Sequence, residues 1–245
     1  MKNFKKLVLI FIVLASFQFQ AQDKKVAVVS FSTNKVIGVS DLELNDLKIL
    51  ADKIFDLQND PNFNLSPVLE KYHTAFFDKY SKNFPFQLLA EENVINNQAY
   101  IDFQPKFPDT DTSVNGIINY DGYKYIYEGI IGKYNEEGMA KLFSNEADGV
   151  LFTNIYFGLV KGFGIGSNAT VKMRAFVRIA LYDKTGKKVW VINEAENSKK
   201  TTVMVKGIPV LDPKKITPMC ESALDELMKD LDKRLKKITK KSKSL

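Results

Sequence analysis

A run of alternating side chains in the second half of the chain constrains the fold most strongly. In TVKMRAFVRIALYD, residues 170–183, apolar and polar positions alternate almost without interruption. Alternation with a period of two is typical of a β-strand with one buried and one wet face. The apolar side carries Val171, Met173, Ala175, Val177, Ile179 and Leu181, and the polar side carries Lys172, Arg174 and Arg178. The three cations are a candidate surface for an anionic partner, and an ordinary solvated strand face is the alternative.

The segments on either side of this run predict two more strands. Asp183-Lys184-Thr185-Gly186 has turn composition, and KKVWVINEAE at 187–196 is expected to return as an antiparallel partner. The preceding stretch, GVLFTNIYFGLV at 149–160, has apolar residues at both its odd and its even positions. A strand of that kind is expected to be covered on both faces.

The remaining patterns complete a mixed order of elements. Strands are predicted at 26–32 and within PFQLLAEENVI at 85–95, and helices at about 66–80, 136–145 and 217–238. Ser40 and Glu43 have the spacing of a capping box, so a further helix is expected to begin after Ser40 and to continue to about Leu57. The apolar stripe of the last helix consists of Cys220, Leu224, Leu227, Leu231, Leu235 and Ile238. The resulting order, β-α-α-β-(insertion)-α-β-β-β-α, predicts an α/β (α+β-like) fold with a mixed sheet of about five strands and flanking helices.

The periodicity weakens between about residues 96 and 132, where prolines, aspartates and tyrosines accumulate. We expect an irregular insertion within a single domain that spans 22–238. Tyr120, Tyr123, Tyr125 and Tyr127 lie in this insertion. Tyrosine offers a large contact area and a polar group at low entropic cost, which favours a partner-binding surface. A hairpin that packs alternate tyrosines on the sheet is the alternative.

The first 21 residues have the pattern of a secretory signal peptide. Lys2, Lys5 and Lys6 precede an apolar run at 7–17, which is shorter than the roughly 20 residues of a membrane-spanning helix. Cleavage near Ala21 would release a protein to the periplasm or the exterior with no transmembrane helix. No cysteine stands directly after the run to accept a lipoprotein acyl chain. A short retained membrane anchor is the alternative.

The charge distribution argues against nucleic acid as a partner. The formal net charge is +6, but the predicted signal peptide and the Lys-rich tail at 239–245 contribute much of this excess. The chain has three arginines, so bidentate recognition of phosphate or guanine is scarcely available. The tail is expected to fray, or to make a weak contact with anionic lipid or polymer.

The motifs that suggest chemistry are incomplete. Gly162, Gly164 and Gly166 lack the spacing and the following helix of a dinucleotide fingerprint, so a hairpin loop is expected. The aspartates at 109 and 111 begin like a calcium loop, but the required glycine and glutamate are missing. With one histidine, His73, and one cysteine, Cys220, both on apolar stripes, we predict no catalytic residue, no cofactor and no metal site.

Three segments resemble a known group of exported domains. They are KKVAVVSFS at 24–32, Ala147-Asp148-Gly149-Val150-Leu151, and LYDKTGKKVWV at 181–191. Together they resemble the α/β domain of curli-secretion-type lipoproteins and the amino-terminal domain of TolB-like translocation proteins. The resemblance implies a non-catalytic assembly or scaffolding part of the bacterial envelope. Lipid anchoring and pore formation are not expected, because this chain lacks the lipidated cysteine and clear pore-forming hairpins.

The sequence therefore predicts an exported envelope protein that acts by binding. We expect it to contact one or more envelope proteins, or a second copy of itself, through the insertion and an exposed sheet edge. A periplasmic hydrolase built from scattered carboxylates and a small-ligand-binding protein with an internal cavity are the alternatives.

Overall fold

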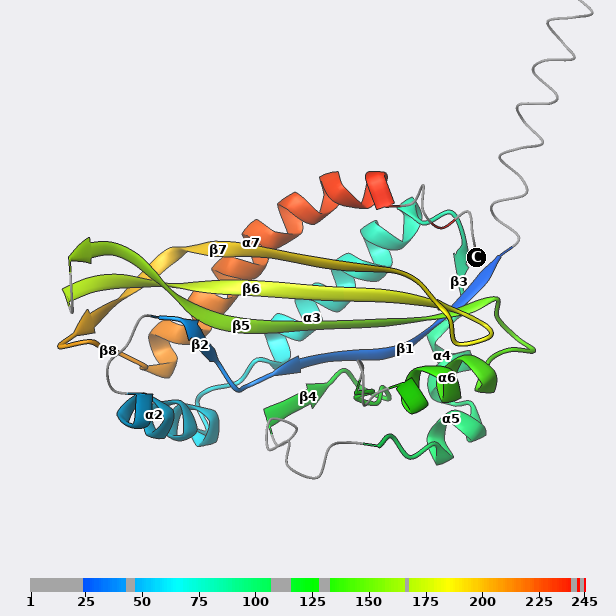
Figure 1. Ribbon diagram of the computed structural model, residues 1–245, viewed down its shortest axis with the longest axis horizontal. Helices are drawn as coiled ribbons and strands as arrows, with labels where there is room; N and C mark the ends of the chain where they lie inside the picture. Colours follow the sequence, from blue (N-terminus) through cyan, green and yellow to red (C-terminus); the bar gives the residue numbers. More distant parts are fainter. Residues whose placement is uncertain are drawn as a thin grey trace, which may run out of the picture.

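A mixed sheet of eight strands forms the centre of the molecule (Figure 1). The computed structural model describes residues 24–42, 47–106, 116–127, 133–165 and 168–238, together with Ser242 and Leu245. The strands are β1 (Lys25–Asn34), β2 (Gly38–Asp41), β3 (Gln87–Leu88), β4 (Ile117–Asn119), β5 (Gly149–Ile165), β6 (Asn168–Asp183), β7 (Lys188–Val205) and β8 (Ile208–Pro209). The predicted α/β class is confirmed. The predicted number of about five strands was wrong, because β2, β4 and β8 contain only two to four residues each and leave little periodicity to detect.

The helices occupy both sides of the sheet. They are α2 (Leu47–Asn59), α3 (Ser66–Ala75), α4 (Glu91–Ile95), α5 (Gln98–Asp102), α6 (Lys133–Leu142) and α7 (Pro213–Ile238). A π-helical turn, Phe76–Tyr80, and a 3₁₀ turn, Ser81–Asn83, extend α3. The helices α4 and α5 lie where the sequence suggested a strand end and an irregular insertion, because five-residue helices are too short to show a periodic stripe. The predicted capping role of Ser40 was wrong, because Ser40 lies in β2 and pairs with the sheet, and α2 spans Leu47–Asn59.

The sheet combines a parallel edge with an antiparallel meander. Its order is β3-β1-β5-β6-β7-β8, with β2 also paired to β5 and β4 to β1. The strand β1 runs parallel to β5, whereas β6 is antiparallel to both of its neighbours, β5 and β7, as predicted. At the β6–β7 turn, the Asp183 carboxylate accepts hydrogen bonds from the Thr185 and Lys187 amides at 2.8 and 3.0 Å. Gly186 completes this turn with φ +86°, a conformation that favours glycine.

The larger hydrophobic core lies on one side of the sheet, here called the α7 face. In Figure 1, α7 and α3 pass behind the long strands. The described members of the predicted stripe are buried on α7, with Leu224 and Leu231 fully excluded from solvent. Cys220 belongs to this stripe, and burial raises the pKa of its thiol. Cys220 therefore acts as a small hydrophobic residue, as expected.

The opposite side, here called the α6 face, has a smaller core that covers only one part of the sheet. The helices α4, α5 and α6 pack there against Ala27, Val29, Val150, Phe152, Ala180 and Tyr182. A bulge in β1 at Val29 supports this packing. The buried Tyr100 hydroxyl donates to the Val29 carbonyl at 2.9 Å and accepts from the Lys124 amide at 2.8 Å. Tyr100 thereby joins β1, α5 and the loop that follows β4.

The start of the last helix differs from the prediction. The helix α7 begins at Pro213, not near Thr217, and Pro218 lies inside it. Asp212 acts as the cap, since its carboxylate accepts from the Lys214 amide at 3.0 Å. Proline at the first helical position is favourable, because its missing N–H has no intrahelical partner. The pair Asp212-Pro213, a capping residue followed by proline, therefore marks the start of α7 in the sequence.

The predicted signal peptide lies outside the described residues, as do most residues of the Lys-rich tail. Two tail positions are described, and both contact the domain. The Trp190 indole donates to the Ser242 hydroxyl at 2.8 Å, and Leu245 packs against the larger core.

Candidate ligand-binding site

The α6 face changes from apolar to polar along the strands, at the point where the cover by the described helices ends. Residues that face one another across β1, β5, β6 and β7 form successive cross-strand rows. The first row contains Phe152, Ala180 and Val191, the second Ser32, Asn154, Arg178 and Asn193, and the third Tyr156, Phe176 and Ala195. The first row lies in the core under α6. The second row, two residues further along β5, is polar, and the third row contains two aromatic side chains.

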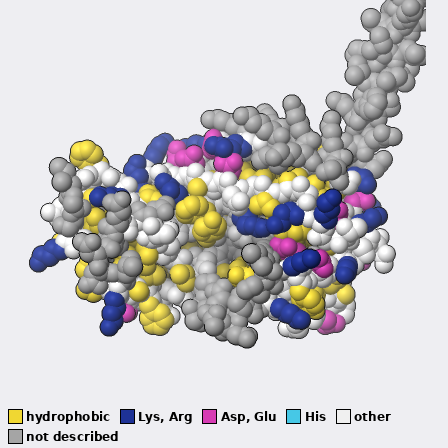
Figure 2. Space-filling view, in the orientation of Figure 1, with side chains coloured by type: hydrophobic (Ala, Val, Ile, Leu, Met, Phe, Trp, Pro, Cys, Tyr) yellow, Lys and Arg dark blue, Asp and Glu magenta, His cyan; other side chains and the backbone are white. Residues whose placement is uncertain are grey.

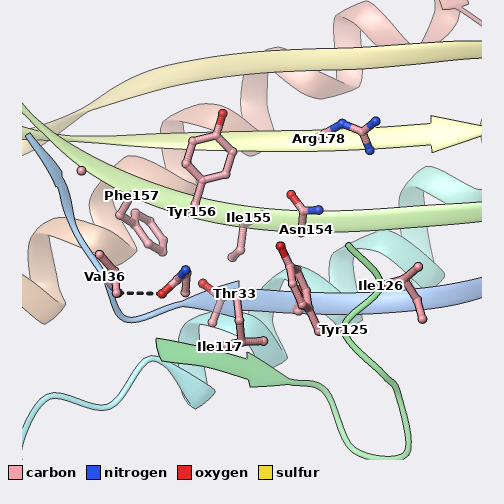
Figure 3. A pocket seen from close by; sticks show the side chains of 13 residues that line it. Thr33, Val36, Ile117, Tyr125, Ile126, Asn154, Ile155, Tyr156, Phe157 and Arg178 are labelled. Atoms are coloured by element: carbon pink, nitrogen blue, oxygen red, sulfur yellow. Dashed lines mark hydrogen bonds between the residues drawn. The ribbon is translucent and has the colours of Figure 1, made fainter. Parts of the chain in front are cut away.

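A pocket of about 330 Å³ lies where the second and third rows meet the segment around β4 (Figure 3). Its walls come from the end of β1, the loop to β2, the segment 117–126, β5 and β6. The described lining residues are Ser32, Thr33, Asn34, Val36, Gly38, Ile117, Tyr125, Ile126, Asn154, Ile155, Tyr156, Phe157 and Arg178. The volume falls at the lower end of the range typical of small-ligand sites, which is roughly 300–1,000 Å³.

Local backbone geometry holds the loop between β1 and β2 at the rim. The Asn34 side chain accepts a hydrogen bond from the Val36 amide at 2.8 Å, which is the dashed line beside Val36 in Figure 3. The Lys35 amide donates to the Gly116 carbonyl at 2.8 Å. A Cβ atom at position 116 would lie 2.5 Å from the Asn34 side-chain oxygen, so only glycine permits this approach. The pocket wall is thus fixed by short-range contacts.

Polar groups from three adjacent strands gather on one side of the pocket. Ser32 is 1% exposed, and its hydroxyl has no hydrogen-bond partner among the described residues. Asn154 faces Ser32 across the β1–β5 pair and Arg178 across the β5–β6 pair. The described residues that line the pocket include no carboxylate and no imidazole. Such a lining supplies hydrogen-bond donors and one positive charge.

Aromatic side chains form the other side. Tyr156 and Phe176 stack with ring centroids 4.7 Å apart and an angle of 4° between their planes. Tyr156 is 43% exposed, so part of this pair remains available to another molecule. Figure 3 shows Tyr125, from the segment after β4, with its phenol directed toward β5. The pocket therefore has an aromatic side and a polar side.

The structure brings together two of the seven residues proposed from sequence. Tyr125 and Arg178 both line the pocket. Arg174 lies on the same face one cross-strand row beyond Phe176, where its Nε donates to Asn197 at 2.8 Å, and Lys172 lies one further row along β6. Tyr127 is partly buried, and its carbonyl accepts from the Asn135 side chain at 3.0 Å. The basic side chains of β6 and the tyrosines of the segment after β4 therefore meet only at the pocket, through Arg178 and Tyr125.

Tyr120 and Tyr123 belong to a different cluster, centred on His73. The Tyr120 ring stacks on the His73 ring with centroids 3.6 Å apart. One carboxylate oxygen of Glu91, in α4, lies 2.7 Å from His73 Nε2 and accepts from the Tyr123 hydroxyl at 2.8 Å. Tyr123 is only 5% exposed and Phe31 packs against both tyrosines. These contacts fasten the loop after β4 to α3 and α4.

The pKa shifts in this cluster follow from burial and hydrogen bonding. Burial raises the pKa of Glu91, but hydrogen bonds from His73 and Tyr123 outweigh it and lower the pKa overall. Burial, followed by the charge of Glu91, raises the pKa of Tyr123 far above its ordinary value. His73 is a packed, hydrogen-bonded histidine, as the sequence suggested, and it does not line the pocket described above.

The last long strand of the sheet, β7, is the described strand to which the expectation of an exposed edge best applies. Among the described residues its outer side pairs only with β8, through Met204 and Val205. A bulge interrupts the strand near Ser198, whose hydroxyl accepts from the Met173 amide at 3.0 Å. Glu194 forms an ion pair with Arg234 of α7 at 3.1 Å. Bulges and charges of this kind protect an edge from unspecific pairing.

The structure also bears on the glycine and aspartate motifs of the sequence. Gly162 and Gly164 lie at the end of β5 in a hairpin, with no helix after them, whereas the aspartate loop at 109–115 lies outside the described residues. Within the described part of the chain, no group of three histidine, cysteine or acidic residues has a metal-binding arrangement. Among the described helices, none is long and apolar enough to span a bilayer.

Comparisons with known proteins leave the chain without an assigned family. No family model matches the sequence, and no curated protein matches it. One solved structure with a similar course of the chain is a neuraminyllactose-binding hemagglutinin homolog from Helicobacter pylori, at 9% identity, with 89% of each chain covered and a TM-score of 0.37.

Several residues of the pocket escaped the sequence analysis. Ser32 and Asn154 belong to strands whose sequences predict uniform burial, and Tyr156 has the pattern of an ordinary strand residue. The only available signal was the asparagine within the apolar run GVLFTNIYFGLV. Asparagine is mostly exposed in proteins, and Asn154 is only partly buried, at the point where the cover by the described helices ends.

Proposed function

We propose that this chain is an exported, non-catalytic envelope protein that binds an acidic protein surface through the uncovered part of the α6 face. The observation that carries this proposal is the stacked Tyr156–Phe176 pair beside Arg174, on a part of the sheet face that none of the described helices covers. Tyrosine, phenylalanine and arginine are enriched at the centres of protein interfaces. Figure 2 shows hydrophobic and basic side chains next to one another over the middle of the sheet on this side.

The charge of this face selects the partner. Lys172, Arg174 and Arg178 project from β6, and the residues that face them across β7 are Thr201, Asn197 and Asn193. No carboxylate occurs among these six positions. A surface of this kind attracts carboxylates and repels other basic surfaces. The signal-peptide pattern and the resemblance to envelope assembly domains support a partner in the same compartment.

A site-specific crosslink tests the proposal directly. We would place a photo-crosslinking amino acid at position 156 in cells that make the full chain, and a control at position 55. Phe55 is 66% exposed on α2, whose buried residues belong to the larger core and not to the core of the α6 face. We expect position 156, but not position 55, to give a discrete adduct with an envelope protein that has an acidic surface. Charge reversal, Arg174→Glu, should reduce that adduct at least about tenfold.

Two outcomes would contradict the proposal. Equal adducts from positions 156 and 55 would show collisional capture, and an adduct that Arg174→Glu leaves unchanged would remove the electrostatic argument. Export is tested separately by the amino-terminal sequence of the mature protein, which we expect to begin near residue 22. A chain that retains its first residues in the cytosol would contradict export.

A further inference from the structure

We propose that the free end of the three long strands docks on the surface of an anionic lipid bilayer. This end, here called the strand tip, consists of residues 161–165 of β5, 168–171 of β6 and 199–206 of β7 and the turn after it. In Figure 1 the strand tip extends to the left beyond β2 and α7. The inference goes beyond the proposed function, because it concerns a different part of the molecule and a lipid surface in place of a protein.

An exposed aromatic ring at the strand tip is the first argument. Phe163 is 92% exposed, more than any other large hydrophobic residue that the structure describes. Its backbone position is fixed, since its amide donates to the Thr170 hydroxyl at 2.9 Å and its carbonyl accepts from that hydroxyl at 3.1 Å. Val203 and Val205, two residues apart on the same face of β7, are also exposed. The fold therefore holds apolar side chains out in solvent, where they contribute nothing to the core.

The charge of the strand tip is the second argument. Its residues include Lys161, Lys199, Lys200 and Lys206, but no aspartate and no glutamate. Lys199 pairs with Glu226 of α7 at 3.1 Å. The other three lysines are exposed and have no ion-pair partner among the residues that the structure describes. Cations without an internal partner attract an anionic surface.

Two groups of carboxylates lie near the strand tip on other elements. Asp56, Asp60 and Asp212 line a separate hollow between α2 and β8, where Lys53 supplies a cation. Asp41 ends β2 and pairs with the residue of β5 that directly precedes the strand tip. Because the strand tip extends beyond β2, a bilayer that approaches it end-on meets the exposed ring and the three lysines before it meets Asp41.

The pattern of side chains favours a bilayer over a protein partner. The centre of a protein interface usually combines several packed anchors, and arginine is preferred there over lysine. The strand tip instead presents one ring between two glycines, Gly162 and Gly164, and all its cations are lysines. Lysine is a flexible point charge that suits mobile headgroups, and amphipathic or aromatic rings are favourable at the depth of the headgroups. A single ring surrounded by lysines therefore matches a fluid anionic surface.

Vesicle flotation tests the proposal. Mature protein purified from cells that express the full chain would be mixed with vesicles of phosphatidylcholine, either pure or with about 30% phosphatidylglycerol. We expect binding to the anionic vesicles to be at least about tenfold tighter than binding to the neutral ones, and to weaken as the salt concentration rises.

Matched variants locate the surface. Lys161→Gln/Lys206→Gln should weaken binding to the anionic vesicles at least about tenfold, because each lysine near such a surface strengthens binding about fivefold. Lys82→Gln/Lys141→Gln removes the same charge from two exposed lysines outside the strand tip. This control should change binding by less than about threefold, since those lysines do not face the bilayer.

A fluorescent substitution reports insertion of the ring. The chain has one tryptophan, Trp190, which is buried, so its emission should not respond to vesicles. The emission of Phe163→Trp should shift to shorter wavelength when anionic vesicles are added, because the ring leaves water. Phe55→Trp, at an exposed aromatic position of α2, should show no such shift.

Four results would overturn the inference. They are equal binding to the neutral and the anionic vesicles, equal weakening by the two double-lysine variants, an unshifted emission of Phe163→Trp, or a protein adduct from a photo-crosslinker at position 163 without any binding to vesicles. The last result would assign the strand tip to a protein partner. Because the vesicle experiment uses purified protein, its failure and the failure of the crosslink at position 156 are distinguishable.

Discussion

The two parts of the α6 face are built on the same strands, and the described helices cover only one of them. In the covered part, Phe152 and Tyr182 pack edge to face at 5.3 Å between ring centroids, under α6. In the uncovered part, Tyr156 and Phe176 stack in parallel and remain partly exposed. The difference teaches that aromatic content alone does not locate a core. The identity of the intervening row, polar at Asn154 and Arg178, separates packing from a surface available for binding.

The largest expected effect comes from truncating one ring in each part. Phe152 is fully buried, so Phe152→Ala should lower the free energy of unfolding by about 3–5 kcal/mol through lost burial and a cavity. Tyr156→Ala, four residues along the same strand, should cost below about 1.5 kcal/mol, because the ring is already 43% exposed. Urea denaturation of both variants measures the difference.

Equal losses of unfolding free energy in Phe152→Ala and Tyr156→Ala would contradict the distinction between the covered and the uncovered part. They would mean that Tyr156 is a structural residue, and the uncovered part could then no longer be interpreted as a surface reserved for binding. Val203→Ala is a useful reference on the same sheet, since Val203 is 49% exposed and should change stability little.

The sequence was sufficient to predict the long strands because each carries many residues of one period. The prediction of β6 was confirmed, since the odd residues from 169 to 181 are buried and the even residues from 170 to 178 are only partly so. The short elements were missed for the opposite reason, as two or three residues in β4 or β8 define no period. Their position depends on tertiary contacts, such as the approach of Gly116 to Asn34.

The candidate site was only half predictable for a related reason. Arg178 was identified from its place in the alternating run, and Tyr125 from the tyrosine cluster. Their convergence depends on the loop after β4 crossing the end of β1, which no local pattern encodes. The same crossing carries Tyr120 and Tyr123 to His73 instead, so the four tyrosines do not form one surface.

A medium effect should follow from removing one hydroxyl that joins the covered part to β1. Tyr100→Phe deletes the donor to the Val29 carbonyl and the acceptor for the Lys124 amide. The buried Val29 carbonyl and the part-buried Lys124 amide would lose this partner, so we expect a loss of about 1–3 kcal/mol in the free energy of unfolding. Tyr134→Phe is the matched control, because Tyr134 is 52% exposed and should change stability by less than about 0.5 kcal/mol. A loss as small as that of the control would show that this bond does not hold α5 to the sheet.

The smallest effect is a pH dependence at the His73 cluster, where the loop that reaches the pocket is anchored. The hydrogen bonds from His73 and Tyr123 lower the pKa of Glu91 in the folded protein below its ordinary value of 4.5. A group with a depressed folded pKa binds fewer protons in the native state, so the unfolded state gains from acidification. The contribution of Glu91 is therefore complete above about pH 4.5 and is lost as the pH falls through the folded pKa.

Glu91→Gln isolates this contribution, because glutamine keeps the shape but does not titrate. The free energy of unfolding, measured by urea denaturation between pH 7 and pH 3, should fall less steeply with acidification in Glu91→Gln than in the unmodified protein. Glu92→Gln, the neighbouring exposed position, controls for a general change of charge and should preserve the original slope. If Glu91→Gln and Glu92→Gln show the same slope, the carboxylate contributes only packing at this junction, and the loop that carries Tyr125 to the pocket is held by the aromatic contacts of Tyr120 and Tyr123 alone.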